Sequence, residues 1–151
     1  MRAYAYVVGP DNGPAAVLVQ LAAGLGLAGV SRFSTLAEAE AQAQQTPVCF
    51  FLFAATDDVR KLRSVADAIR FSPARRLRFS PLIYFAGSPS VETITACINM
   101  GFDDVITMPF TPSRVLERMM RQVGQSLVYY ETATYFGPDR RGRLQGKAGL
   151  P

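Results

Sequence analysis

The chain has 151 residues, of which 49% are hydrophobic and 19% charged, and its formal net charge is +4. This length predicts one domain with a buried core, and the charge is too small to indicate nucleic-acid binding. Because the chain has no histidine, Ser-His-Asp or Cys-His catalysis and histidine-ligated metal sites are excluded.

The cysteines and the apolar segments bear on the cellular compartment. Cys49 and Cys97 form no CxxC motif, which is typical of a reducing compartment rather than of a disulfide framework. Residues 15–30 are uncharged but contain Gln20 and three glycines, so they fall short of the roughly 20 apolar residues of a membrane span. The N-terminus does not resemble a signal peptide. We therefore expect a cytoplasmic protein that does not bind membranes.

The first half of the chain alternates strand and helix patterns. Residues 4–8 predict a strand, which ends in a dense turn signal, and residues 14–25 predict a helix that opens on a proline. Residues 29–33 predict a second strand. A capping box formed by Thr35 and Glu38 then opens a second helix.

The middle of the chain repeats this alternation. Residues 48–53 are continuously apolar, which predicts a strand covered on both faces. Residues 57–71 predict a third helix, and residues 81–85 predict another buried strand. A fourth helix is expected to begin with Ser88 as its cap and Pro89 at its first position, and to stop at Gly101.

The last strand and helix complete the pattern. Residues 104–107 predict a fifth strand, and Thr111 followed by Pro112 opens a fifth helix that ends at Gly124. Five strands that alternate with five helices predict an α/β domain over residues 1–124, with a doubly wound, five-stranded parallel sheet. Residues 125–151 are aromatic and then rich in Gly, Pro and Arg, which predicts a C-terminal tail that is partly ordered at best.

Two segments carry a resemblance to a known family. GFDDVITMPFTPSRVLERM, residues 101–119, resembles the closing segment of a response-regulator receiver domain, where a Gly-x-Asp-Asp-Tyr-hydrophobic-Thr-Lys-Pro-Phe pattern ends the fifth strand. PLIYFAGSPSVETITACINM, residues 81–100, is similar to the fourth strand and helix of the same family. The resemblance covers roughly residues 3–124 and implies the CheY-like, flavodoxin-like fold.

The same resemblance implies a phosphorylation site at the carboxyl ends of the strands. An active receiver has an acidic pair for Mg²⁺, an Asp that accepts the phosphoryl group, a Ser or Thr, and a Lys. Here the acidic pair falls on Gly9 and Pro10, and the acceptor on Phe53 or Ala54. The hydroxyl and lysine positions hold Ala86 and Met108, and Val105 takes the place of the aromatic switch residue. We therefore expect a degenerate pseudo-receiver that is not an enzyme and has no metal site and no cofactor.

Nearby residues leave alternatives open. Asp57 and Asp58 are displaced phosphoryl acceptors or, as we favour, charges at a helix N-terminus. Asp11 is a metal ligand or, as we favour, a turn residue. Pro109 and Phe110 match the family pattern; the proline follows a cis bond, as is common in the family, or simply ends the strand in a turn.

Charge and polarity indicate where a partner could bind. The helix over residues 14–25 carries no charge, which has two interpretations. Either a partner or a second copy of the chain covers its outer face, or that face is exposed to solvent and consists of small, weakly apolar residues. Residues 1–59 have a net charge of −3, whereas residues 60–78 carry seven basic residues and one acidic residue, a net charge of +6. This basic segment is a solvated surface, or it binds an acidic protein or a phosphate-bearing ligand.

The C-terminal part offers two further candidate surfaces. The tail places aromatic residues before Arg140, Arg141 and Arg143, a run similar to Arg-rich motifs that bind cyclic dinucleotides; alternatively its aromatic part packs on the domain. In receivers, the fourth helix, fifth strand and fifth helix form the usual output face. Arginines line the corresponding fifth helix: Arg114, Arg118 and Arg121.

The leading hypothesis is a phosphorylation-independent receiver-like protein of a bacterial signalling pathway, which acts by binding a protein partner or a second copy of itself. The alternative is a sensor that binds a cyclic dinucleotide such as cyclic di-GMP through the Arg-rich tail. Nucleic-acid binding is not expected, because no recognition motif accompanies the basic residues.

Overall fold

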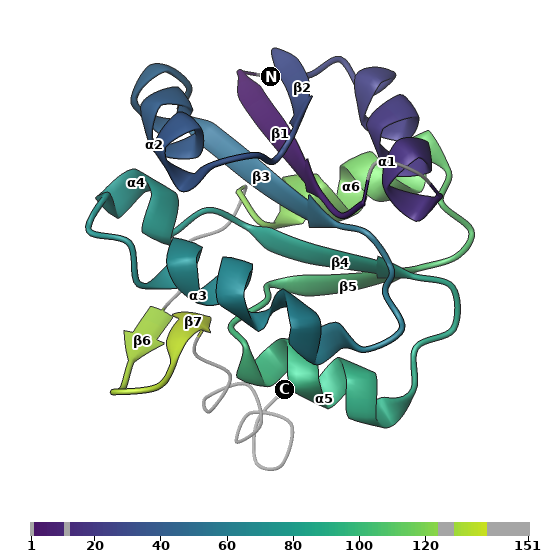
Figure 1. Cartoon of the computed structure of the whole chain (residues 1–151). Coiled ribbons are helices and arrows are strands. Elements are labelled where there is room, and N and C mark those ends of the chain that lie inside the picture. Colours follow the sequence, from purple (N-terminus) through teal and green to yellow (C-terminus); the bar gives the residue numbers. More distant parts are fainter. Residues whose placement is uncertain (1, 11–12, 124–128, 139–151) are drawn as a thin grey trace, which may run out of the picture.

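A computed structural model describes residues 2–10, 13–123 and 129–138 of the chain. Its main feature is a parallel sheet of five strands in the order β2-β1-β3-β4-β5 (Figure 1). The strands match the predicted segments to within one residue at each end: β1 Ala3–Val8, β2 Gly29–Arg32, β3 Val48–Phe53, β4 Leu82–Ala86 and β5 Asp104–Thr107. The predicted α/β fold with a doubly wound parallel sheet is confirmed.

The helices differ in number from the prediction. Seven helical segments lie in the described part of the chain: α1 Pro14–Ala23, α2 Leu36–Gln45, η1 Val59–Leu62, α3 Arg63–Arg70, α4 Arg75–Arg78, α5 Val91–Asn99 and α6 Pro112–Arg121. The prediction of five helices was wrong in two places. The expected helix over residues 57–71 opens as the 3₁₀ turn η1 before α3 begins, and the short helix α4 was not predicted.

Local chemistry explains these boundaries. The Asp58 side chain accepts a hydrogen bond from the backbone N–H of Arg60 and so caps η1. Ser90, not Ser88, caps α5, because its hydroxyl accepts from the N–H of Thr93 at 3.1 Å. The predicted capping box is confirmed on one side, since the Thr35 hydroxyl accepts from the N–H of Glu38.

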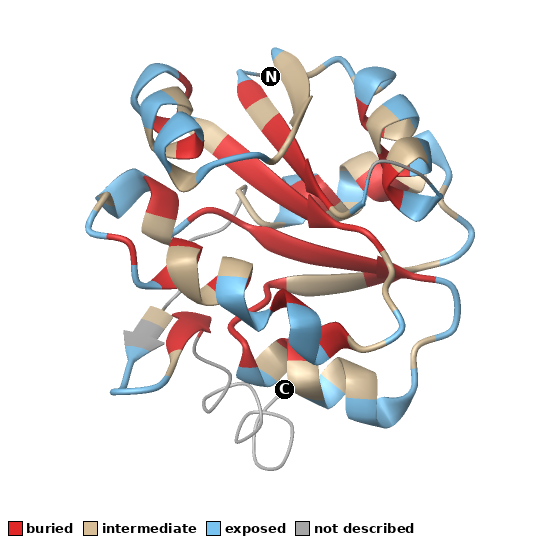
Figure 2. Cartoon of the chain, in the orientation of Figure 1, coloured by how far each residue is buried: buried red, intermediate tan, exposed pale blue. Residues whose placement is uncertain are grey.

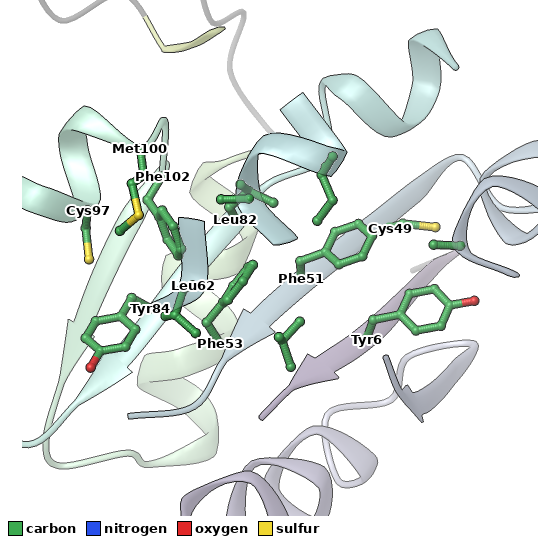
Figure 3. Packing of buried hydrophobic residues seen from close by; sticks show 14 of the residues in the cluster. Tyr6, Cys49, Phe51, Phe53, Leu62, Leu82, Tyr84, Cys97, Met100 and Phe102 are labelled. Atoms are coloured by element: carbon green, nitrogen blue, oxygen red, sulfur yellow. The ribbon is translucent and has the colours of Figure 1, made fainter. Parts of the chain in front are cut away.

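The sheet separates two apolar layers. Alternate residues of β1 and β3 point to opposite faces, as the two-residue period of a strand requires. Phe51 and Phe53 pack in one cluster with η1, α2, α3, α4 and α5, whereas Phe50 and Leu52 pack in the other with α1 and α6. The three central strands are therefore the most buried part of the molecule (Figure 2). Figure 3 shows the aromatic packing of the first cluster.

Part of the C-terminal tail is folded. Residues Tyr129–Glu131 (β6) and Phe136–Pro138 (β7) pair as an antiparallel hairpin, which lies beside α3 and α4 (Figure 1). Phe136 is only 5% exposed, so the expectation that the aromatic part of the tail packs on the domain is confirmed for these residues. None of the described helices is both long and apolar enough to cross a membrane.

Candidate functional site

The carboxyl ends of the parallel strands meet along one border of the sheet, called here the C-terminal edge. Val8 stands beside Phe53, and Ala86 stands beside Thr107. The parallel register thus brings together the positions that the resemblance assigned to phosphorylation: Gly9, Pro10, Phe53, Ala54, Ala86 and Met108.

Tight packing closes the position expected for the acidic pair. A Cβ atom at Gly9 would lie 3.0 Å from the Cβ of Ala54 and 3.1 Å from that of Ala15, and Gly9 has φ +154°. The Gly9 carbonyl oxygen also accepts a hydrogen bond from the guanidinium of Arg32. Two methyl groups therefore crowd the position where a receiver places a carboxylate. Pro10 beside it is exposed and offers no donor.

The acceptor position lies inside the apolar core. Phe53 and Ala54 are 0% and 2% exposed, and the Phe53 ring packs 4.7 Å from that of Phe102 (Figure 3). The N–H of Ala54 donates to the carbonyl of Val8 and continues the sheet ladder. Neither residue offers an oxygen nucleophile to a phosphoryl donor.

The hydroxyl and lysine positions are also apolar. Ala86 is 7% exposed, whereas Met108 is 63% exposed, and its Sδ lies 3.2 Å from where a Cβ of Gly87 would be. The thioether thus covers the strand end at the place where a receiver holds a lysine. The Met108–Pro109 peptide bond is cis, which decides between the two interpretations of Pro109.

Asp57 and Asp58 are engaged at the start of η1. Asp57 pairs with Lys61 at 2.9 Å and Asp58 with Arg60 at 3.0 Å. Hydrogen bonds from Lys61 and Arg60, respectively, lower the pKa of the two carboxyls. The interpretation of these aspartates as charges at a helix N-terminus is confirmed for Asp58, which caps η1.

The described residues contain no group of three or more Cys, Asp or Glu placed to hold a metal ion. Asp11, for which a turn role and a metal-ligand role were both considered, lies outside the described residues.

The arginines of the expected partner face are largely occupied within the chain. Arg118 pairs with Asp104 at 2.5 Å, and this hydrogen bond raises the pKa of the guanidinium. Arg114 donates to the carbonyl oxygens of Thr107 and Pro109. Arg121 pairs with Glu117 on the exposed side of α6 at 3.3 Å. Arg114 and Arg118 therefore hold α6 against β5 in this structure.

Sequence reasoning did not single out a buried charge cluster at the opposite border, called here the N-terminal edge. Arg70 and Asp103 pair at 2.5 Å, and both side chains are 0% exposed. The Asp103 carboxylate also accepts from the N–H of Leu82 and from the hydroxyl of Tyr129 in the hairpin. The sequence contains one signal for this burial. Arg70 lies four positions after Ala66, an apolar residue of the predicted helix, and residues four apart lie on the same face of a helix.

The proposed ligand-binding arginines of the tail, Arg140, Arg141 and Arg143, lie outside the described residues.

Comparison with known proteins finds similarity in structure alone. No family model matches the sequence, and no curated protein matches it. The solved structures include the chemotaxis protein CheY4 of Vibrio cholerae, with a TM-score of 0.60 and 18% identity, over 80% of this chain and 98% of that one.

Two further similar structures come from Burkholderia. The pilus assembly protein CpaE of B. thailandensis has a TM-score of 0.58 and 15% identity, over 83% of this chain and 100% of that one. A pilus assembly-related protein of B. pseudomallei has a TM-score of 0.60 and 17% identity, over 84% of this chain and 93% of that one. Strand order, the two helical layers and these structures lead to one conclusion: the chain has the fold of the CheY-like receiver domains of response regulators.

Proposed function

We propose that this chain is a receiver-like signalling protein that works without phosphorylation, by binding a protein partner. The observation that supports this most is the packing at Gly9, where the methyl groups of Ala54 and Ala15 leave no room for a side chain. In the same proposal the protein is cytoplasmic, is not an enzyme and requires no cofactor.

The chemistry of phosphoryl transfer explains why the residues at these positions matter. Phosphoryl transfer to a carboxylate requires an oxygen nucleophile and cations that neutralise the phosphate, and Mg²⁺ requires hard oxygen ligands. At the C-terminal edge, Gly9, Ala54 and Ala86 supply no side-chain oxygen, and Met108 supplies no charge. These side chains favour a signal that is transmitted by binding rather than by phosphorylation.

The first experiment incubates the full chain with acetyl phosphate and Mg²⁺ and measures the intact mass and the amide chemical shifts. We expect no phosphoryl adduct and no shift change, because Phe53 and Ala54 stand at the acceptor position and carry no side-chain oxygen. A receiver domain that retains the aspartate and the lysine is the positive control. An acid-stable or acyl-linked phosphoryl group on this chain would contradict the proposal.

The surface of α5 and β5 is our choice for partner binding. A hollow of about 220 Å³ opens there; its lining combines apolar side chains, Ile94 and Val105 among them, with the paired carboxylates of Asp103 and Asp104. Val91, the first residue of α5, is 76% exposed. In the family that this fold resembles, the corresponding surface is the usual output face. A hollow with apolar side chains in its lining, and an exposed valine on the same helix, suit an apolar anchor from a partner.

The second experiment compares Val91→Asp with Val17→Asp, a matched change on α1, where Val17 is 57% exposed. Each tagged chain is cross-linked in its own cells, and the captured proteins are identified by mass spectrometry. Val91→Asp is expected to lose a partner that wild type and Val17→Asp both retain, since a buried charge opposes an apolar contact. Loss with Val17→Asp alone, together with a smaller mass by light scattering, would instead assign the contact to a second copy through α1.

The names of two similar structures are consistent with this proposal. The Burkholderia proteins are named for pilus assembly rather than as response regulators, so this fold is found outside proteins named for phosphorelay. The alternative function, a cyclic-dinucleotide sensor that uses Arg140, Arg141 and Arg143, remains a prediction.

A further inference from the structure

A second hollow opens at the N-terminal edge of the sheet, on the side of the molecule away from the degenerate phosphorylation positions. Its volume is about 320 Å³. It lies between the start of β3, the helix α4 with the turn into β4, and the residues that follow α6. Its lining includes Val48, Phe79 and Val123 together with Arg75 and Arg76. We call it the N-edge pocket.

The pairing of charges singles out the two arginines of the N-edge pocket. Residues 60–78 contain seven basic side chains, and five of them form ion pairs with carboxylates: Arg60, Lys61, Arg63, Arg70 and Arg78. Among the described residues, no carboxylate pairs with the other two, Arg75 and Arg76. The unpaired charge of the basic segment is thus concentrated in one pocket.

Nearby groups do not neutralise this charge. Among the described residues that line the N-edge pocket none is acidic, and Glu40 of the neighbouring helix α2 accepts a hydrogen bond from the Ser72 hydroxyl. Arg76 donates to the carbonyl oxygens of Ala43 and Gln44, at 3.4 and 3.5 Å. Arg2 adds positive charge at the same edge, because it precedes Ala3, which stands beside Val48. The pocket therefore attracts anions.

The rest of the lining is largely apolar. Val48, Pro81 and Val123 form part of the wall, and the Phe79 ring is 40% exposed beside them. A free inorganic anion would leave this apolar surface in water. A pocket with apolar walls and a few polar groups at one side is typical of small-molecule sites, and 320 Å³ lies at the small end of their range.

We propose that the N-edge pocket binds a small organic phosphate with a flat apolar part, of the size of a mononucleotide. The guanidinium groups of Arg75 and Arg76 hold the phosphate oxygens through paired N–H donors, a geometry that suits guanidinium better than ammonium. The flat part lies against Phe79 and Pro81. This site is separate from the degenerate edge and does not depend on how the protein binds its partner.

Phe79 connects the N-edge pocket to the hairpin. Its ring packs edge-on against Tyr129 and against Phe136, each at 5.2 Å between ring centres. A ligand that fixes Phe79 therefore also steadies β6 and β7, and slower amide exchange in residues 129–131 and 136–138 is a readout that nonspecific charge binding would not produce.

The experiment titrates the full chain by calorimetry with AMP, with inorganic phosphate and with adenosine. We expect AMP to bind and each of its two parts to bind at least about tenfold more weakly, since neither part uses both the arginines and the apolar wall. No AMP binding at millimolar concentration would overturn the proposal. Phosphate that binds as tightly as AMP would overturn the assigned ligand class.

Matched variants locate the binding. Arg75→Ala and Arg76→Ala are expected to weaken AMP binding by about tenfold or more each, and Arg75→Lys and Arg76→Lys by less. The control is Arg63→Ala, which removes the same charge from the first residue of α3, a residue that does not line the N-edge pocket. Equal weakening by Arg63→Ala, or none by the pocket variants, would overturn the assignment.

Discussion

Arg70 is the largest fully buried side chain in the described part of the chain. Its guanidinium has five N–H donors, and they form five hydrogen bonds, with the carbonyl oxygens of Gly101, Arg78 and Ser80 and with the carboxylate of Asp103. A buried charge is tolerated only when it is paired and hydrogen-bonded in this way. Arg70 thereby joins the end of α3 to the starts of β4 and β5.

Replacement of Arg70 by Met is expected to lower the free energy of unfolding by about 3–5 kcal/mol, because Asp103 remains buried without its cation. Urea denaturation measures the change. The control is Arg63→Met, whose ion pair with Asp67 is exposed and 3.7 Å long, so its loss is expected to change the free energy by less than about 1 kcal/mol. Equal effects of the two substitutions would show that the buried pair contributes no more than a surface pair.

Single residues mark a limit of sequence-based prediction. The strand ends were predictable from apolar runs, so the positions of Gly9, Ala54 and Met108 at one edge followed from parallel topology. The contact of Arg32 with Gly9 and the pairing of Arg70 with Asp103 join residues 23 and 33 positions apart. No local period encodes such pairs, and Arg70 was therefore grouped with the solvated basic segment.

The hairpin of β6 and β7 shows how an element outside the sheet is held. Phe136 contacts Phe79 and Tyr129 through its ring, and the Arg78 guanidinium lies 4.8 Å from its centre. The Tyr129 hydroxyl donates to Asp103, and burial raises the pKa of this tyrosine. Apolar, aromatic and charge-assisted contacts therefore all connect the hairpin to the domain.

Phe136→Ala is expected to lower the free energy of unfolding by about 3 kcal/mol, the usual cost of truncating a buried Phe, and to speed amide exchange across both hairpin strands. The matched change Glu131→Ala removes only a 3.7 Å ion pair with Arg78 and is expected to alter stability by less than about 1 kcal/mol. An unchanged exchange rate in Phe136→Ala would mean that the hairpin is held without its ring.

The length of a helix or strand decided whether it could be predicted from the sequence. Strands and helices with several apolar residues at a regular spacing were identified to within a few residues. The four-residue helix α4 is too short to show a period, and it forms because Leu77, 0% exposed, anchors it to the core. Asp58 caps η1, the 3₁₀ turn that precedes α3. A capping aspartate at this position is equally compatible with one continuous helix, so the sequence alone does not predict the division.

The molecule as a whole places two thiols inside its first apolar cluster. Burial raises the pKa of Cys49 to about 11 and that of Cys97 to about 12, from an ordinary value of 9.0. Between pH 9 and these values an unfolded chain loses thiol protons that the folded chain keeps. The corresponding stability is complete below pH 9 and is lost as the pH rises through the folded values.

We expect the free energy of unfolding to fall above pH 9 by about 1 kcal/mol per pH unit for each thiol. Urea denaturation in the presence of a reductant, between about pH 8 and pH 9.5, measures the slope where the thiols titrate ahead of the tyrosines, whose ordinary pKa is 10.0. The double variant Cys49→Ala, Cys97→Ala is expected to be less stable overall but to show a shallower slope. The same slope in both proteins would contradict the assignment to the thiols.

The sequence predicts the net charge of each segment but not which of its charged side chains remain unpaired in the folded molecule. Residues 60–78 carry a net charge of +6, yet most of this charge is neutralised by ion pairs that the fold creates. Of the basic side chains in this segment, Arg75 and Arg76 form no ion pair with a described carboxylate, and both line the N-edge pocket. At the C-terminal edge, by contrast, tight packing at Gly9 leaves no room for a side chain. The two descriptions differ because some ion pairs join residues that are distant in the sequence, and a sum of charges over one segment does not include them.

The contact between Gly101 and Gly137 restricts which residues these two positions can hold. A Cβ at Gly137 would lie 2.7 Å from the Cα of Gly101, and a Cβ at Gly101 would lie 2.4 Å from the carbonyl oxygen of Phe136. Gly101 also belongs to the motif that resembles receiver domains, where it ends a helix with φ +87°. The backbone of the hairpin therefore lies where side chains at positions 101 and 137 would be, so the hairpin can rest on the turn before β5 only while both residues are glycine.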